Sequence, residues 1–344
     1  MITSSGPVRV VQWCTGHIGQ IAIRHFAANP TFELAGVYTT SAAKDGVDAG
    51  VLAGMDPVGV TATTDKEKLL TLDADCVHYA PLQPDLDDLE ALLRSGKNVV
   101  TPLGFTFPRP DDEQTIRLQA ACQAGGTSFH AGGIHPGFAG DILALVGSRL
   151  HSRLDQVVVT EVVDFSAAPA SDMLTAFGFG RDPEEAHRTH RLALDVYSQS
   201  IGLLATGLGL TVDRYECGLT VAVSDRDLTV ASGLIPAGKV AGMCRRWEAI
   251  VDGRPAIVFQ SKWKMADDLT PEIVDGASRY IVEFLGEPAT TFTLEEHPSN
   301  GRVDAGRTWT TMAVVNMIHD VVAAPPGIRT HLDLPPGKPR GLFH

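Results

Sequence analysis

Up to Ala131, short apolar runs alternate with segments whose apolar residues recur at helical spacing. Runs of this length predict buried strands, and the amphipathic segments predict the helices between them. The alternation gives right-handed crossovers, and therefore a doubly wound parallel sheet covered by helices on both faces. The expected strands are 8–13, 34–39, 75–80, 98–101 and 127–131, and the expected helices are 18–28, 86–95 and 111–124.

After Val146 the alternation gives way to longer strands. The turn Asp252-Gly253-Arg254-Pro255 joins two of them as a hairpin. Long strands joined by tight turns predict a second, α+β domain built on a largely antiparallel sheet. The expected strands are 156–165, 216–224, 240–251, 256–265 and 279–285, with a helical stretch over 184–208.

These patterns divide the chain into an α/β domain over 1–146, an α+β domain over 147–307 and a C-terminal tail over 325–344. Between the last two, helical spacing over Trp309–Ala323 ends at Ala324-Pro325-Pro326, which is a helix stop. We therefore expect a late helix at about 308–324.

The first expected strand runs directly into Cys14-Thr15-Gly16-His17-Ile18-Gly19 and then into a helix. In the dinucleotide fingerprint GxGxxG, the second glycine lets the backbone approach a pyrophosphate and the third lets helix and strand pack closely. The helix N-terminus supplies N–H donors. Gly16 and Gly19 fall at those positions, while Cys14 replaces the first glycine. Residues 14–19 are therefore a candidate dinucleotide-binding loop, and a tight turn without a ligand is the alternative.

The end of the second strand bears on the choice of nicotinamide cofactor. An NAD site normally carries Asp or Glu there to bind the ribose 2′-hydroxyl, but this sequence has no acid before Asp45. Ser41 can donate a hydrogen bond, and Lys44 can place a cation near a 2′-phosphate. The pattern favours NADP, with NAD as the alternative if Lys44 is an ordinary loop lysine.

Two further strand ends complete the expected cofactor site, at Ala80-Pro81 and at Thr101-Pro102. Ligands of doubly wound sheets lie at the carboxyl ends of the strands. We therefore expect Ala80, Pro81 and Thr101 to border the ribose and the nicotinamide. The simpler role of the prolines is to end the strands.

Net charge and cysteine usage limit the kinds of binding partner and the cellular compartment that we expect. With 28 basic and 41 acidic residues the net charge is −13, which repels phosphate backbones and anionic headgroups, so we expect no nucleic-acid or membrane partner. Five scattered cysteines without a CxxC pair, and a start without a signal-peptide apolar segment, indicate a cytoplasmic protein with reduced thiols. His187 and His190 share a helix face without a third ligand nearby, so no metal site is expected.

Two residues are the candidate catalytic groups. His135 precedes Pro136-Gly137 at the entry to an expected helix over 138–148, where the helix dipole favours a neutral imidazole able to act as a general acid. A structural loop histidine is the alternative. Glu161 and Asp164 are three residues apart on one strand and so point to opposite faces. We expect Asp164 to be the carboxylate on the substrate side.

Four segments together resemble the dihydrodipicolinate-reductase-like family that contains 2,4-diaminopentanoate dehydrogenase and the native amine dehydrogenases. They are VVQWCTGHIGQ, GKNVVTPLGFTFP, GGIHPGF and NMIHDVVAAPPGIRTHLDLP. The resemblance implies an NAD(P)-binding Rossmann domain, a late helix around Asn316 that folds back beside it at the cofactor, a second domain with an open sheet, and a homodimer. It also implies reversible reductive amination of a small ketone or aldehyde, with hydride passing between nicotinamide and an imine carbon.

The sequence differs from that family at one position that matters for the chemistry. The amine-forming relatives carry a glutamate after the fourth strand that handles protons at the amine nitrogen, whereas the matching stretch here, TPLGFTFP over 101–108, has no acid. Imine chemistry needs a group that stabilises the iminium or moves its proton. The alternatives are therefore a carbonyl or C=C reductase without amination, and a catalytically silent nucleotide-binding protein.

Overall fold

The parallel sheet forms where the sequence alternates apolar runs with amphipathic segments. In the computed structural model, which describes residues 6–169, 171–189, 197–274, 276–297 and 305–343, it has the order β15–β6–β5–β4–β1–β2–β3. Every neighbouring pair is parallel. The strands are β1 (Val8–Trp13), β2 (Phe32–Tyr38), β3 (Ala62–Thr63), β4 (Cys76–Tyr79), β5 (Asn98–Thr101), β6 (Ser128–Ala131) and β15 (Gly327–Ile328).

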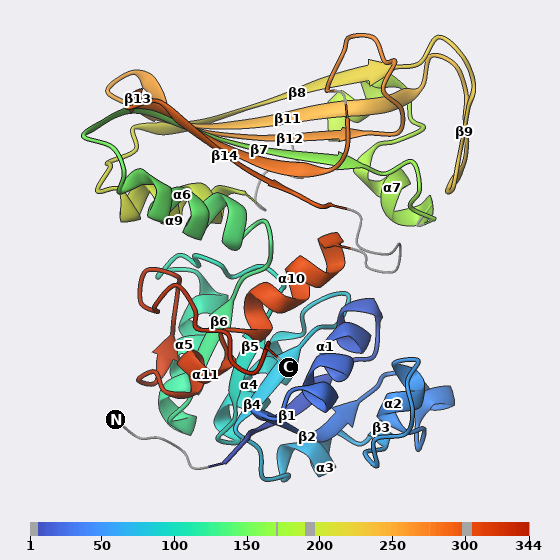
Figure 1. The fold of residues 1–344 in the computed structure, drawn as a ribbon, viewed down its shortest axis with the longest axis vertical. Helices are drawn as coiled ribbons and strands as arrows, with labels where there is room; N and C mark the ends of the chain where they lie inside the picture. Colours follow the sequence, from blue (N-terminus) through green and yellow to red (C-terminus); the bar gives the residue numbers. More distant parts are fainter. Residues whose placement is uncertain (1–5, 170, 190–196, 275, 298–304, 344) are drawn as a thin grey trace. The chain divides into compact units, whose positions relative to one another are not determined.

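The strand order confirms the predicted doubly wound Rossmann sheet (Figure 1). β1 pairs with β2 on one side and with β4 on the other, so the direction of winding reverses between β1 and β4. Ligands of such folds bind at this switch point, outside the carboxyl ends of the strands. The loops after these strands are therefore the place to look for a site.

The longer helices of this unit begin and end within two residues of the predicted bounds. They are α1 (His17–Ala28), α4 (Leu86–Arg94) and α5 (Glu113–Gly125). The sequence analysis missed α2 (Ala49–Leu52) and α3 (Lys66–Leu70), because a single turn of helix is too short to show a periodicity.

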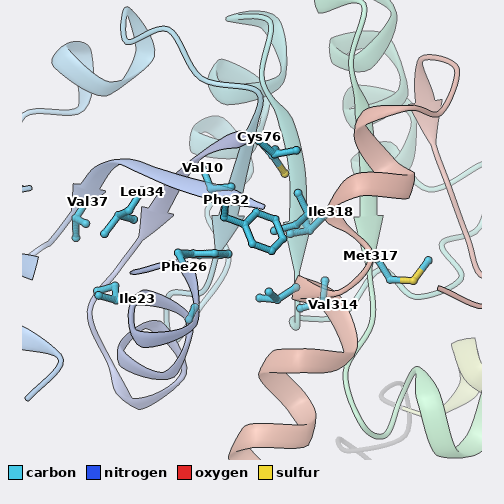
Figure 2. Close-up of a cluster of buried hydrophobic side chains, with 14 of the residues drawn as sticks. Val10, Ile23, Phe26, Phe32, Leu34, Val37, Cys76, Val314, Met317 and Ile318 are labelled. Carbon is cyan, nitrogen blue, oxygen red and sulfur yellow. The ribbon is translucent and has the colours of Figure 1, made fainter. Parts of the chain in front are cut away.

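The predicted late helix returns to the first unit as two helices, α10 (Ala305–Val315) and α11 (Ile318–Val322), with a turn at Asn316. α10 packs against α1. Figure 2 shows Val314 and Ile318 beside Phe26 and Phe32 in one buried apolar cluster, so burial of these side chains holds the C-terminal helices in place.

The expected tail over 325–344 needs correction. After α11, Gly327 and Ile328 pair with Ser128 and Phe129 of β6 and add a strand to the edge of the sheet. The segment is too short to give a strand pattern in the sequence. Its backbone nevertheless completes a ladder that would otherwise end at β6.

The second unit is built on a mixed sheet in the order β14–β13–β7–β12–β11–β8. All neighbours are antiparallel except β7 and β12, so the predicted largely antiparallel sheet is confirmed. The strands are β7 (Arg153–Asp164), β8 (Arg214–Val223), β11 (Val240–Val251), β12 (Arg254–Lys264), β13 (Arg279–Glu287) and β14 (Thr290–Glu295), with β9 (Leu228–Val230) and β10 (Gly233–Ile235) as a separate ribbon.

The predicted hairpin joins β11 and β12 through Asp252 and Gly253, which have φ of 50° and 73°. Two left-handed residues in succession match the twist of the flanking strands. α6 (Leu143–Ser148) and α9 (Ser198–Gly207) cover one face of the sheet, and α7 (Ser171–Phe177) and α8 (Pro183–Thr189) complete the unit. His190, the partner of His187 in the sequence analysis, lies outside the described residues.

The two units comprise residues 1–138 with 300–344, and residues 139–299. The predicted boundary at 146/147 therefore needs correction to 138/139. The reason is packing, because α6 contacts β7, β13 and α9 of the second unit. The sequence analysis had assigned this helix to the first unit only because it follows β6 along the chain.

Candidate functional site

The loop between β1 and α1 has the geometry of a dinucleotide fingerprint. At Gly19 a Cβ would lie 2.2 Å from the Cys14 carbonyl oxygen, so only glycine allows the close contact of helix and strand. Gly16 precedes α1 without a side-chain cap, and a Cβ there would meet nothing within 4 Å. The start of α1 is thus open to an approaching anion.

Cys14 adopts the conformation of the glycine that it replaces. Its φ is 74°, in the left-handed region that favours glycine. Its N–H donates to the Tyr38 carbonyl of β2, at 2.9 Å. Burial raises the pKa of the Cys14 thiol to about 11, so the side chain stays protonated at neutral pH and acts as a small apolar group.

Lys44 reaches this loop from the segment after β2. It ends a short 3₁₀ turn (Ala42–Lys44), and its Nζ donates to the carbonyl oxygen and to Oγ1 of Thr15, at 3.2 and 3.1 Å. Asp45, the first acid after β2, instead accepts hydrogen bonds from the N–H and hydroxyl of Thr64. The side chain that reaches the glycine loop from the end of β2 is therefore a cation.

Apart from Asn316, the other predicted cofactor residues lie at the carboxyl edge of the parallel sheet. The Ala80 N–H donates to the Trp13 carbonyl, and the Thr101 hydroxyl accepts from the Leu103 N–H in the turn after β5. Ser41 begins the 3₁₀ turn after β2, Pro81 follows β4, and His17 and Ile18 open α1. Asn316 lies in the turn between α10 and α11.

The segment after β6 is a tight turn that carries His135. The Gly133 N–H donates to the Pro136 carbonyl and the Phe138 N–H donates to the Gly133 carbonyl, both at 2.8 Å. Gly137 has φ of 132°, and a Cβ there would lie 2.4 Å from the Gly133 nitrogen. The glycines therefore close the turn, and His135 is half-buried at its tip.

The predicted helix after this turn begins as a π-helix (Phe138–Ile142) and continues as α6. The carboxylate of Asp141, on the π turn, is fully buried. Single π turns inside helices are frequent at functional sites. The sequence analysis predicted a regular helix over 138–148, because a π turn has no recognisable pattern in one sequence.

The two carboxylates of β7 lie on opposite faces of its sheet, as the spacing predicted. Asp164 is half-buried, and its Oδ1 accepts from the Ser166 N–H at 2.8 Å, which stabilises the turn after the strand. It belongs to the second unit and His135 to the first, so their pairing at one substrate stays a prediction.

Glu161 is the buried carboxylate of β7. Its Oε2 accepts from the Tyr197 hydroxyl at 2.8 Å and from the Trp263 indole N–H at 2.9 Å, and its Oε1 accepts from the Tyr280 hydroxyl at 3.3 Å. Burial and the nearby carboxylate raise the pKa of both tyrosines. The sequence analysis preferred Asp164, because the three donors come from segments far from Glu161 in sequence.

Two histidines lie beside the His135 turn, His130 fully buried and His331 half-buried. His130, at the end of β6, bonds through Nδ1 to the Arg329 carbonyl at 2.7 Å, and burial lowers its pKa to about 4. The His331 ring lies 4.8 Å from that of His130, and burial lowers its pKa to about 3. His331 fills the space beside Gly132, where a Cβ would lie 2.7 Å from its Nε2. No sequence pattern pointed to His331, because β15 was not predicted.

The stretch 101–108, where amine-forming relatives were expected to carry an acid, begins at the last residue of β5 and lies in the connection to α5. Within the described parts of the chain, no group of three or more His, Cys, Asp or Glu side chains is arranged to hold a metal ion. In the same residues, no helix is long and apolar enough to cross a membrane. All five cysteines are free thiols.

Comparison with known sequences gives related dehydrogenases. Residues 138–342 match the family model for the 2,4-diaminopentanoate dehydrogenase C-terminal domain. The chain is 31% identical to an amine dehydrogenase of Streptomyces virginiae over 95% of this chain and 96% of that protein. It is 24% identical to a 2,4-diaminopentanoate dehydrogenase of Acetoanaerobium sticklandii over 75% of this chain and 71% of that one.

Comparison with solved structures supports the same fold. An amine dehydrogenase from Mycobacterium smegmatis superposes with a TM-score of 0.80 at 22% identity, covering 98% of this chain and 99% of that one. GenD2 from gentamicin A biosynthesis, solved in complex with NAD, superposes with a TM-score of 0.55 at 16% identity, covering 96% and 91%.

Proposed function

The chain belongs to the family of 2,4-diaminopentanoate dehydrogenase and the amine dehydrogenases, and from that premise we propose that it catalyses reversible, NAD(P)H-dependent reductive amination of a small ketone or aldehyde through an imine. Membership makes it an oxidoreductase. The observation that carries the finer proposal is the β1–α1 loop, where an open approach at Gly16 lies beside the Lys44 cation on Thr15.

The loop fits a nicotinamide dinucleotide. Residues 14–19 would hold the pyrophosphate through backbone N–H groups and the start of α1. Ser41 and Lys44 would bind a 2′-phosphate, which favours NADP over NAD because Asp45 is turned to Thr64. Ala80, Pro81, Thr101 and Asn316 would border the ribose and the nicotinamide. A relative in fold, GenD2, was solved with NAD, which supports the class of cofactor.

When bound, a nicotinamide cofactor supplies hydride to the carbon of a C=N or C=O bond. The chain itself must then place that carbon and move protons at the attached nitrogen or oxygen. We assign the proton to His135, because its turn lies at the carboxyl edge of the sheet and holds the ring half-buried. We assign Asp164 to the substrate side, where a carboxylate stabilises a cationic iminium.

A second candidate is carbonyl or C=C reduction without amination, and one observation favours it. The stretch 101–108 has no carboxylate to handle protons at an amine nitrogen. The same absence is what a catalytically silent nucleotide-binding protein would show. A carbonyl or C=C reductase would turn over without ammonia, whereas a silent nucleotide-binding protein would show no turnover at all.

Assembly and location are proposed on the resemblance to the family. We propose a homodimer, as the resemblance to the family implies. The five free thiols support a cytoplasmic protein. Light scattering coupled to size exclusion would give the mass of one chain if the dimer proposal is wrong.

Cofactor oxidation measured with a panel of small ketones and aldehydes, with and without ammonium, tests the function. Turnover only with ammonium supports amination. Turnover that does not depend on ammonium supports carbonyl reduction and contradicts amination. If NADPH binds but no ketone or aldehyde of the panel is turned over, the result contradicts both enzyme proposals and supports a catalytically silent nucleotide-binding protein.

A further inference from the structure

Gln12, on β1, places a side-chain amide under the dinucleotide loop. The residue is fully buried, and its Nε2 donates to the carbonyl oxygens of Trp13 and Cys14, at 3.1 and 3.0 Å. A Cβ at Gly19 would lie 3.0 Å from this Nε2 and 2.2 Å from the Cys14 oxygen. Because Gly19 has no side chain, the Gln12 amide and the Cys14 carbonyl have the space to form their hydrogen bond.

This contact sets the direction of the peptide between Cys14 and Thr15. In a trans peptide the C=O and the following N–H point in opposite directions. Because the Cys14 carbonyl is turned inward to Gln12, the Thr15 N–H points the opposite way, away from Gln12. An N–H that points this way is the donor that a pyrophosphate needs.

Gln12 is itself held in place by His78 of β4. The His78 Nδ1 donates to the Gln12 Oε1 at 2.7 Å, and both side chains are fully buried. Burial lowers the pKa of His78 to about 3, so the ring stays neutral. The edge of the ring meets Phe26 of α1, with ring centroids 6.3 Å apart. The amide of Gln12 thus has one orientation, with oxygen toward His78 and nitrogen toward the loop.

We propose that Gln12, oriented by His78, is a positioning residue that keeps Cys14 in its left-handed conformation and aims the Thr15 N–H at the cofactor. The need for it follows from Cys14. Glycine takes φ of 74° without strain, whereas cysteine requires a compensating contact. The side chain of Gln12 supplies what the missing first glycine would have supplied. The inference rests on the proposed nicotinamide cofactor.

Direct binding of NADPH, followed by cofactor fluorescence, tests the proposal in a cycle of variants. Gln12→Leu is expected to raise the Kd about ten-fold, since one hydrogen bond from an N–H to a phosphate is worth that much. Cys14→Gly alone gives the Kd against which the effect of Gln12→Leu in the glycine background is compared. Adding Cys14→Gly to Gln12→Leu is expected to recover at least about three-fold of the loss, because glycine needs no compensating contact.

Matched variants separate positioning from a general loss of structure. Ser128→Ala removes a buried hydroxyl at the amino end of β6, away from the loop, and should leave the Kd unchanged. Gln12→Leu alone leaves the buried His78 N–H without its acceptor, which could unfold the protein. The double variant Gln12→Leu with His78→Leu removes that N–H as well, so NADPH binding can still be measured. This double variant should bind NADPH as weakly as Gln12→Leu.

Two results would overturn the inference. One is an unchanged Kd in both Gln12 variants while the wild type binds NADPH. The other is a Cys14→Gly effect on the Kd that is equally large in the wild-type background and in the Gln12→Leu background, which would mean that positions 12 and 14 are not coupled. A wild-type protein that binds neither NADPH nor NADH would overturn the proposed function itself, and the inference with it.

Discussion

The Lys44 ammonium bonds to both the hydroxyl and the backbone carbonyl of Thr15, and so joins the end of β2 to the dinucleotide loop. The contact brings together two segments that the sequence analysis assigned to one site for different reasons. One was chosen for its glycines and the other for the absence of an acid. Their proximity is the main geometric support for a phosphorylated cofactor.

Lys44→Ala is expected to weaken NADPH binding roughly ten-fold while changing NADH binding little, because only NADPH carries the 2′-phosphate that the cation would bind. Isothermal titration with each cofactor measures the two values. Lys68→Ala, which removes an exposed lysine of α3, is the control. No loss for NADPH would show that Lys44 is an ordinary loop lysine, and equal losses for both cofactors would show that it only supports the loop through Thr15.

His135→Gln is expected to lower kcat by about 10²- to 10⁴-fold, the usual contribution of a positioned acid or base, with cofactor affinity unchanged. Glutamine keeps hydrogen-bonding atoms but cannot donate a proton readily. Steady-state kinetics with saturating cofactor measures the effect, and His297→Gln, at an exposed position, is the control. A kcat close to that of the wild type would leave His135 a structural residue.

The two carboxylates of β7 are expected to differ in what they affect. Asp164→Asn should lower kcat with a free energy of unfolding close to that of the wild type. Glu161→Gln should lower the free energy of unfolding by about 1–3 kcal/mol, because one of three donors then faces an NH₂ group. Denaturant unfolding and kinetics on both variants separate the roles. A selective loss of kcat in Glu161→Gln, with stability retained, would transfer the substrate-side role to Glu161.

Stability is expected to fall in acid because three histidines have lowered pKa values in the folded protein. Burial lowers the pKa of His78 and His331 to about 3 and that of His130 to about 4, all below the unfolded value near 6.5. The unfolded chain therefore binds more protons, and stability present above pH 6.5 is lost as the pH falls toward 3 to 4. Each histidine adds a slope of up to about 1.4 kcal/mol per pH unit.

Denaturant unfolding between pH 4.5 and 7 measures that slope, and His331→Phe should reduce it. Phenylalanine retains the ring beside His130 and Gly132 but cannot be protonated. The wild type and the variant should converge in their pH dependence only above pH 6.5. An identical slope in both proteins would mean that the pKa of His331 is not lowered in the folded state.

Much of the fold could be predicted because its elements repeat a pattern long enough to recognise. β1, β5 and β11 have the predicted bounds, and the Asp252-Gly253 turn joins β11 and β12 as the predicted hairpin. What was missed was short, as with α2 and β15, or was decided by packing, as with the assignment of α6 to the second unit. Periodicity carries no information on either.

The site was predictable only where backbone geometry demands a residue type. Gly19 must be glycine because of the Cys14 carbonyl, so its spacing could be recognised in the sequence. The environments of Glu161 and His331 are formed by contacts between residues far apart in sequence. Gln12 shows the same limit, because its amide became meaningful only when β4 placed His78 beside it.

Deuterium transfer tests the central proposal most directly. The enzyme would be incubated with NADPH carrying deuterium at the transferable position of C4, a small ketone and ammonium, and the products analysed by mass spectrometry. The proposal predicts an amine with one deuterium on the carbon that carried the ketone oxygen, formed only when ammonium is present. A deuterated alcohol formed without regard to ammonium, or no labelled product from any ketone while NADPH is bound, would contradict it.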